Sequence, residues 1–178
     1  TSWGVSTRLI GALIMAHSDD DGLVLPPKLA PIHVVIIPIF KNEDELARVS
    51  EQAERIAKEL RKLGYSIKFD NRDTHKPGFK FAEYELKGVP VRIAIGPRDL
   101  DNRTVEVARR DTKEKQLMSI DSIVSAIPGL LDNIQENIYK KAHAFRESMI
   151  TKVNSFDEFK KVLDEKGGFV SAHWDGTP

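Results

Sequence analysis

The stretch "IHVVIIPIFKNEDELARVSEQAERIAKELRKLGYSIKFD" (residues 32–70) decides the fold. Its first part, 32–40, is a continuous β-branched apolar run, which is typical of a central strand covered on both faces. Asn42 and Glu45 are spaced as in a capping box at the start of a helix. Apolar residues then recur at spacings of three and four until a glycine, and a second strand is expected at 65–70. The stretch therefore predicts a βαβ unit with parallel strands.

The residues after this unit extend the sheet. The expected elements are a polar loop at 71–78, a helix at 79–88 ended by Gly88, a strand at 91–96, a turn at 97–102, an antiparallel hairpin around 111–113, a helix at 121–149 with a break or restart at Pro128, a helix within 155–168 and a strand from 169. The stripe expected to be buried on the long helix consists of Leu131, Ile134, Ile138, Ala142 and Phe145. Residues 32–150 thus predict an α/β fold with a mixed, mostly parallel five-stranded sheet flanked by helices.

The residues before this domain form a separate piece. "TSWGV" (1–5) is expected to end a strand, Ser6 to cap a helix, and the almost wholly apolar residues 9–16 to form a buried helix. "HSDDDGLVLPPKLAP" (17–31) contains Asp-Gly and three prolines and is interpreted as a connector between domains. The expected division is 1–31 as part of a neighbouring domain, 32–150 as the α/β domain, and 151–178 as the start of a further domain.

Composition narrows the function classes. The 178 residues include 27 basic and 27 acidic side chains, so any nucleic-acid binding must come from a local patch. There are no cysteines, which excludes disulfides, thiolate catalysis and cysteine-ligated zinc within these residues and fits a reducing compartment. No apolar run approaches the roughly 18 residues of a membrane span, so no membrane partner is expected.

Arg8 lies in the first turn of the expected N-terminal helix. The helix dipole presents partial positive charge there, so a cation at this position needs an anion. A guanidinium beside free helix N–H groups suits a phosphate. A carboxylate of a neighbouring domain is the equally good alternative.

The stretch 71–99 carries the densest mixture of cations and aromatic rings. Its members are Arg72, His75, Lys76, Lys80, Lys87, Arg92 and Arg98, with Phe79, Phe81 and Tyr84 between them and Asp73, Glu83, Glu85 and Asp99 nearby. Single-stranded RNA is recognised by aromatic rings that stack on bases and by polar groups on base edges. Guanine offers acceptors to Lys or Arg and donors to a carboxylate. The alternative is a solvated charged face over a core aromatic residue.

Other motifs are weaker. The run His17, Asp19, Asp20 and Asp21 could suggest a metal site, but aspartates before a glycine more often form a turn, and the alternating ligands of a calcium loop are absent. The chain has no P-loop, no GxGxxG motif and no nucleophile elbow. No metal-ligating residues are therefore assigned.

Two of the quoted segments resemble a known family. "TSWGVSTRLIGALIMAHSDDDGLVLPPKLAPIHVVIIPIFK" (1–41) resembles the third signature motif of class II aminoacyl-tRNA synthetases running into their anticodon-binding domain. "DNRDTHKPGFKFAEYELKGVPVRIAIGPRDL" (70–100) is similar to the matching segment of prolyl-tRNA synthetases of the eukaryote/archaeon-like type, which many bacteria also carry. The resemblance covers essentially the whole chain. It implies that 1–31 is the end of the catalytic domain and 32–150 the anticodon-binding domain.

The resemblance implies roles for particular residues. Arg8 would contact the phosphates of ATP as the catalytic residue, and Ser2, Trp3 and Gly4 would lie on the floor of the pocket for proline and adenylate. The residues expected to contact a proline anticodon with guanines at its second and third bases are Arg72, Phe79, Lys80, Glu85, Arg92 and Arg98.

The resemblance also implies the setting of these residues. The full-length enzyme would join proline to its tRNA with ATP and Mg²⁺, as a cytoplasmic homodimer whose interface lies mostly in the catalytic part. The first two class II motifs are absent from the chain, so the fragment alone is expected to be inactive and to bind no cofactor.

The chain departs from the family pattern at two positions. Ala94 stands where family members often have an acidic residue, which removes any base contact there. Trp174 follows His173 where zinc-bearing members have a cysteine, so zinc is not expected.

Other functions remain open at this point. The same domain occurs in other class II synthetases and in non-enzymatic RNA-binding proteins, and residues 1–17 argue against an accessory factor because it has no need of an ATP-contacting motif. A small α/β enzyme with a metabolite at the sheet's switch point is a third possibility.

Overall fold

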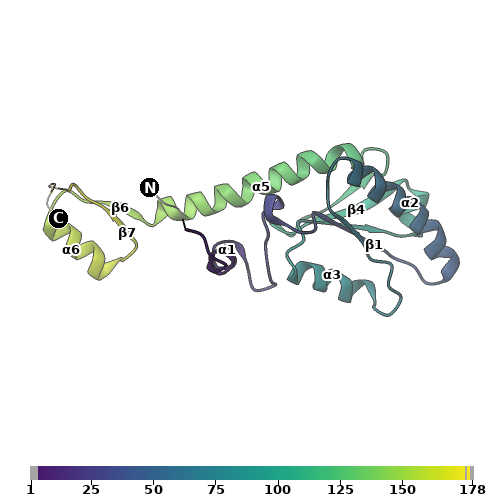
Figure 1. The fold of residues 1–178 in the computed structure, drawn as a ribbon, viewed down its shortest axis with the longest axis horizontal. Coiled ribbons are helices and arrows are strands. Elements are labelled where there is room, and N and C mark those ends of the chain that lie inside the picture. Colours follow the sequence, from purple (N-terminus) through teal and green to yellow (C-terminus); the bar gives the residue numbers. More distant parts are fainter. Residues whose placement is uncertain (1–3, 175, 177–178) are drawn as a thin grey trace. The chain divides into compact units, whose positions relative to one another are not determined.

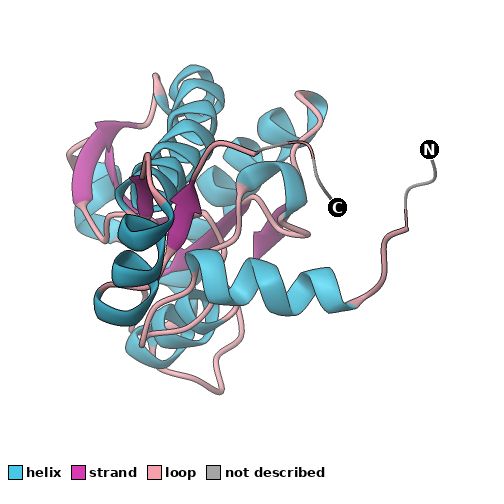
Figure 2. Cartoon of the chain, turned by 90° about the vertical axis from the view of Figure 1, so that its left-hand side faces the viewer, coloured by secondary structure: helices cyan, strands magenta, loops and turns pink. Residues whose placement is uncertain are grey.

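A computed structural model describes residues 4–174 and 176 (Figures 1 and 2). The chain divides into two compact units, Thr1–Ile138 and Tyr139–Pro178. The boundary falls inside one long helix, α5 (Ile123–Ser148). The first unit contains a five-stranded sheet and the second a two-stranded sheet. The three-part division expected from the sequence stays a prediction.

The central sheet is mixed, and its strand order is β2-β1-β3-β4-β5. The strands are β1 (Val34–Pro38), β2 (Ile67–Phe69), β3 (Val91–Ile95), β4 (Thr104–Arg109) and β5 (Lys115–Ser119). β1 is parallel to β2 and β3, whereas β4 is antiparallel to β3 and β5. The predicted βαβ unit, hairpin and five-stranded sheet are confirmed. Parallel pairings are not the majority, because the hairpin adds two antiparallel pairings at one edge.

Helices cover both faces of the sheet (Figure 1). α2 (Glu43–Lys62) and the part of α5 up to Ile138 pack on one face, and α3 (Pro77–Leu86) packs on the other. Successive side chains of β1 point to opposite faces of the sheet. Val34 lies in the core under α2 and α5, Val35 lies in the core under α3, and both are fully buried. Each such side chain stabilises the fold by about 1.5–3 kcal/mol.

Local signals set the ends of α2 and α3. The Glu45 N–H donates to Asn42 Oδ1 over 2.8 Å, which confirms Asn42 as the cap of α2. The Glu45 carboxylate accepts over 2.8 Å from the N–H of Lys41, one residue before the N–H that a capping box uses. After α2, Gly64 has φ of 90°, and after α3, Gly88 has φ of 70°. Both glycines end their helices in the left-handed region, as predicted.

Three expectations for the residues after β3 differ from the structure. α5 continues through Pro128 without a break, since a proline near the start of a helix removes only one backbone hydrogen bond of a helix held by its buried face. Leu131 and Ile138 are buried as predicted, whereas Phe145, which belongs to the second unit, is exposed instead of buried. The expected turn at 97–102 contains a short helix, α4 (Pro97–Asp101).

The N-terminal segment differs from the expectation in three ways. α1 (Arg8–His17) forms as predicted, but its cap is Thr7 instead of Ser6, and no side chain provides the cap hydrogen bond. α1 buries none of its residues within this chain. Residues 4–6 lead into α1 as a loop (Figure 2), and the rest of the predicted strand lies outside the described residues.

Residues 18–31 lie against the α/β domain and are hydrogen-bonded to it. Asp19 and Gly22 exchange backbone hydrogen bonds over 3.1 Å in each direction, which confirms the predicted turn. The Leu23 N–H then donates to the carbonyl of Leu86 at the end of α3 over 3.1 Å. A short 3₁₀ helix, η1 (Pro27–Leu29), leads to β1.

The second unit combines a small parallel sheet with one helix. β6 (Ile150–Lys152) pairs with β7 (Phe169–Ser171), and α6 (Phe156–Glu165) connects them. The Glu158 N–H donates to the Ser155 hydroxyl over 3.2 Å, which is the cap expected for α6.

Candidate nucleic-acid interface

The loop between β2 and α3 carries Arg72, one of the residues predicted to contact RNA. The Arg72 guanidinium donates from Nε to Asp70 Oδ1 over 2.8 Å and from Nη2 to Asp70 Oδ2 over 2.6 Å. Nη2 also donates to Glu83 Oε2 over 2.6 Å. Its side chain is 41 % exposed, so Arg72 reaches the surface with its charge balanced by two carboxylates.

Asp70 is the buried centre of this cluster. Burial opposes ionisation of the carboxyl, but hydrogen bonds from Arg72 and the charge of Lys80 outweigh it. The pKa of Asp70 therefore lies well below its usual range. The backbone N–H of Arg72 also donates to Asp70 Oδ1 over 3.2 Å, so this carboxylate holds the loop where it leaves β2.

Lys80 does not lie on the surface where the sequence places it. Its side chain is 1 % exposed, and its Nζ donates to the carbonyl of Asp70 over 3.1 Å and to the carbonyl of Arg72. Burial lowers the pKa of the ammonium, while the Asp70 carboxylate, 3.7 Å away, favours its charged form. Lys80 thus holds the loop from inside, and its burial leaves no surface for contact with RNA. The spacing of four to the buried Tyr84 was the sequence signal for this inward face.

Phe79 offers an aromatic surface at the same end of α3. Its side chain is 55 % exposed and stacks on the His75 ring, with 4.4 Å between ring centroids and an angle of 24° between planes. The Thr74 hydroxyl lies 2.8 Å from His75 Nδ1. The stack forms an apolar shelf of a kind on which a nucleic-acid base can lie.

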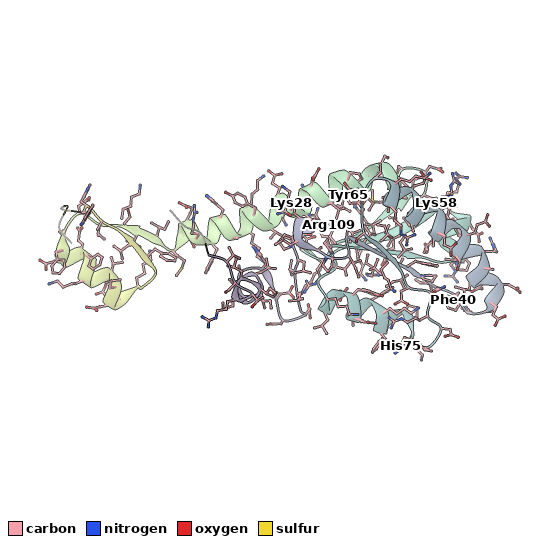
Figure 3. The ribbon with its side chains drawn as sticks, viewed as in Figure 1. Lys28, Phe40, Lys58, Tyr65, His75 and Arg109 are labelled. Carbon is pink, nitrogen blue, oxygen red and sulfur yellow. The ribbon has the colours of Figure 1, made fainter. Side chains whose placement is uncertain are left out.

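A groove lies at the opposite end of α3, against the β4–β5 hairpin. A cavity of about 130 Å³ is lined by Asp21, Glu85, Ala108, Arg109, Arg110, Lys113 and Lys115. A smaller one of about 20 Å³ shares Glu85 and Arg110 with it and reaches Arg92. In Figure 3, His75 and Arg109 lie apart along the domain, so the stack and the groove are separate places.

Most charges around the groove are paired. Arg109 donates to Asp111 over 3.0 and 2.8 Å, and Arg110 and Lys113 bind aspartates of the 19–22 turn. The side chains of Glu85 and Lys115 are exposed and have no hydrogen-bond or ion-pair partner within residues 4–174 and 176. The groove therefore presents one free acceptor and one free donor.

Arg92 is buried beneath this face. Its guanidinium lies over the Phe81 ring, 3.7 Å from the centroid, and Nη1 donates to Glu106 Oε1 over 3.3 Å. Nε is buried with no hydrogen-bond partner. The structure thus places Arg92 between sheet and helix instead of on the surface.

The remaining predicted residues lie elsewhere. Arg98 is exposed on α4, and Arg8 is exposed at the start of α1; neither guanidinium has a partner in the part of the chain that the structure describes. Gly4 is exposed, and Ser2 and Trp3 lie outside the described residues.

The sequence analysis missed Lys115 and Arg110. Lys115 lies opposite Ala108 in the sheet, and Ala108 lies opposite Arg92, so Lys115 is on the same face of the sheet as Arg92. Hairpin register could have revealed this position. Arg110 contacts residues 91 positions away in the chain, and no local pattern indicates that.

Residues 33–130 match the protein family described as "Anticodon binding domain". The chain belongs to this family. It is also 61 % identical over 178 residues to a protein named proline–tRNA ligase from Christiangramia forsetii and 62 % identical over 178 residues to one from Flavobacterium psychrophilum. A third of that name, from Bacteroides fragilis, is 60 % identical over 177 residues.

The match to the first two relatives covers the whole of this chain but only 36 % of their own length, so the chain spans about a third of these proteins. The names of these relatives state no type of the enzyme, so the expected assignment to the eukaryote/archaeon-like type is not borne out. Within residues 4–174 and 176, no helix combines the length and apolar character that a membrane span needs, and no group of three or more His, Asp or Glu side chains is placed to hold a metal ion.

Proposed function

We propose that this chain is part of a proline–tRNA ligase, which uses ATP to join proline to its tRNA, and that the chain binds the tRNA anticodon. The observation that carries the proposal is the identity of about 60 % along the whole chain with proteins of that name, together with the anticodon-binding family match. The ligase activity is proposed for the whole protein, since the chain corresponds to 36 % of the first two relatives.

The two ends of α3 would have different roles in binding RNA. At the groove, the free Glu85 carboxylate suits the N1–H and N2–H₂ donors of guanine, and the free Lys115 ammonium suits its O6 and N7 acceptors. At the shelf, Phe79 and His75 would stack on a base. Arg72 and Arg98 would approach backbone phosphates, because both reach the surface.

The N-terminal segment would belong to the catalytic site. We propose that Arg8 contacts the ATP phosphates and that Ser2, Trp3 and Gly4 line the pocket for proline and adenylate. An exposed guanidinium with no described partner supports the role of Arg8. Mg²⁺ would accompany ATP, held by residues of the longer protein. That protein would act as a homodimer in the cytoplasm.

The test is binding of a proline anticodon stem-loop to this chain at fixed salt, since affinities for RNA depend on ionic strength. A matched stem-loop has both guanines of the anticodon replaced. We expect the native stem-loop to bind at least about tenfold more tightly, which corresponds to about 1.4 kcal/mol. Equal affinities would contradict the proposal.

A further inference from the structure

Arg110 joins three separate segments of the first unit. Its Nη1 donates to Asp19 Oδ2 over 2.9 Å, and its Nη2 donates to Asp19 Oδ1 and to the carbonyl of Gly22. Its Nε donates to the carbonyl of Glu85 over 3.0 Å. One side chain on the β4–β5 hairpin therefore binds both the 19–22 turn and the last turn of α3.

The Arg110 side of this contact is buried, whereas the Asp19 side chain is 33 % exposed. Arg110 is 4 % exposed, so its donors have little access to water. The Arg110 hydrogen bonds hold the pKa of Asp19 well below its usual range, and the carboxylate remains ionised at neutral pH. Lys113 adds a second cation from the same hairpin, paired with Asp19 and Asp21.

The backbone segments beside the contact, 22–25 and 86–88, pack closely against each other. The N–H groups of Leu23 and Leu25 donate to the carbonyls of Leu86 and Gly88 over 3.1 and 3.4 Å. A Cβ added to Gly22 would lie 2.5 Å from the Cα of Leu86, and one added to Gly88 would lie 2.6 Å from the Cβ of Leu23. Such close approach leaves no room for a side chain at either glycine, so the turn packs directly against the end of α3.

We propose that Arg110 is a positioning residue that couples the RNA-binding groove to the segment following α1. The proposal rests on the proposed function. Arg110 lines the groove and holds the carbonyl of Glu85, whose side chain is the free acceptor there. It also holds the turn that directly follows the helix beginning at Arg8. RNA in the groove therefore tightens the 19–22 turn, and a fixed turn favours RNA by the same factor.

The experiment measures amide hydrogen exchange of Leu23 and Leu25 by NMR, with and without saturating proline anticodon stem-loop. In the native chain, RNA is expected to slow exchange of these two amides by about tenfold, which is in the usual range of coupling between sites. The dissociation constant of the stem-loop is measured on the same samples.

Three variants of this chain test the role of the side chain. Arg110→Gln removes the charge, and Arg110→Lys keeps the charge but loses the planar fork that reaches several acceptors, so neither should show RNA-dependent exchange. Asp19→Asn tests the same coupling from the turn if the Arg110 variants do not fold. Arg103→Gln is the matched control, since it breaks a comparable but exposed pair with Asp121 and should keep the full effect.

The outcomes separate this proposal from the proposed function. Tight binding of RNA with unchanged exchange of Leu23 and Leu25 in the native chain would overturn the coupling alone. RNA-dependent exchange that survives in Arg110→Gln or in Asp19→Asn would also overturn it. Absence of any binding would overturn the proposed function and the coupling together. Loss of the effect in the Arg110 and Asp19 variants but not in Arg103→Gln would establish it.

Discussion

The two ends of α3 treat charge in opposite ways. At its start, Arg72 and Lys80 are bound by Asp70, Glu83 and backbone carbonyls, so their charges are used within the fold. At its end, Glu85 and Lys115 are exposed without partners among the described residues. Phe79 and Glu85, six residues apart on α3, are about 9 Å apart along the axis.

The difference teaches that charge in a sequence is not charge available to a ligand. At the start of α3, Arg72 and Lys80 are held by contacts within the fold, and the surface there includes the aromatic stack of Phe79 on His75. The end of α3 offers a polar acceptor and donor. We therefore expect the first end to supply affinity and the second to supply base discrimination.

The largest effect is expected from Lys80→Ala. Removing the ammonium leaves the Asp70 carboxylate buried with one charge partner fewer and two carbonyls without a donor, which should lower the free energy of unfolding by about 3–5 kcal/mol. Urea denaturation measures this change. Lys87→Ala is the control, since Lys87 is exposed and its pair with Glu83 should contribute no more than about 1 kcal/mol. Equal effects of both substitutions would show that Lys80 has no internal role.

Acid should destabilise the first unit through the same cluster. The folded pKa of Asp70 is below its unfolded value, so its contribution to stability is complete above about pH 5 and is lost as pH falls below about 4. The charged and titratable groups facing it are Arg72, Lys80 and Tyr84. Urea midpoints between pH 6 and pH 2 should decline less in Asp70→Asn than in the native chain. Parallel declines would argue against this assignment.

Phe79→Ala should weaken RNA binding at the start of α3. Loss of one stacked base costs about 1–3 kcal/mol, or about 5- to 150-fold in affinity. Titration of the anticodon stem-loop at constant salt measures it. Phe156→Ala removes an even more exposed phenylalanine, in the second unit, and should leave the affinity unchanged.

Arg98→Ala should have the smallest effect. Loss of a phosphate contact weakens binding uniformly across sequences, and it should reduce the slope of log affinity against log salt by about one. Lys58→Ala is the control, since Lys58 lies on α2, which packs on the face of the sheet opposite α3 (Figure 3). An unchanged slope would remove Arg98 from the interface.

Local sequence signals predicted much of the fold. The Asn42 cap, the β-branched run of β1 and the glycine after α3 act through neighbouring residues, and each is confirmed. The predictions of a mostly parallel sheet and of a break at Pro128 were wrong, because both features depend on packing across the sheet.

The candidate site was harder to predict for the same reason. A lysine is usually exposed, and only the contacts of Lys80 with Asp70 reveal its burial. Arg110 binds Asp19 across 91 positions, which no window of sequence contains. Phe79 is exposed and Phe81 is partly buried, and helical spacing alone does not say which of the two faces the sheet.

The division of roles along α3 is tested most directly by the ratio of two dissociation constants, for the stem-loop with both anticodon guanines replaced and for the native one. Glu85→Gln should lower this ratio by about tenfold, because an amide cannot accept both guanine donors as a carboxylate does. Phe79→Ala should weaken both complexes and leave the ratio unchanged. A ratio that falls in Phe79→Ala and persists in Glu85→Gln would contradict the account.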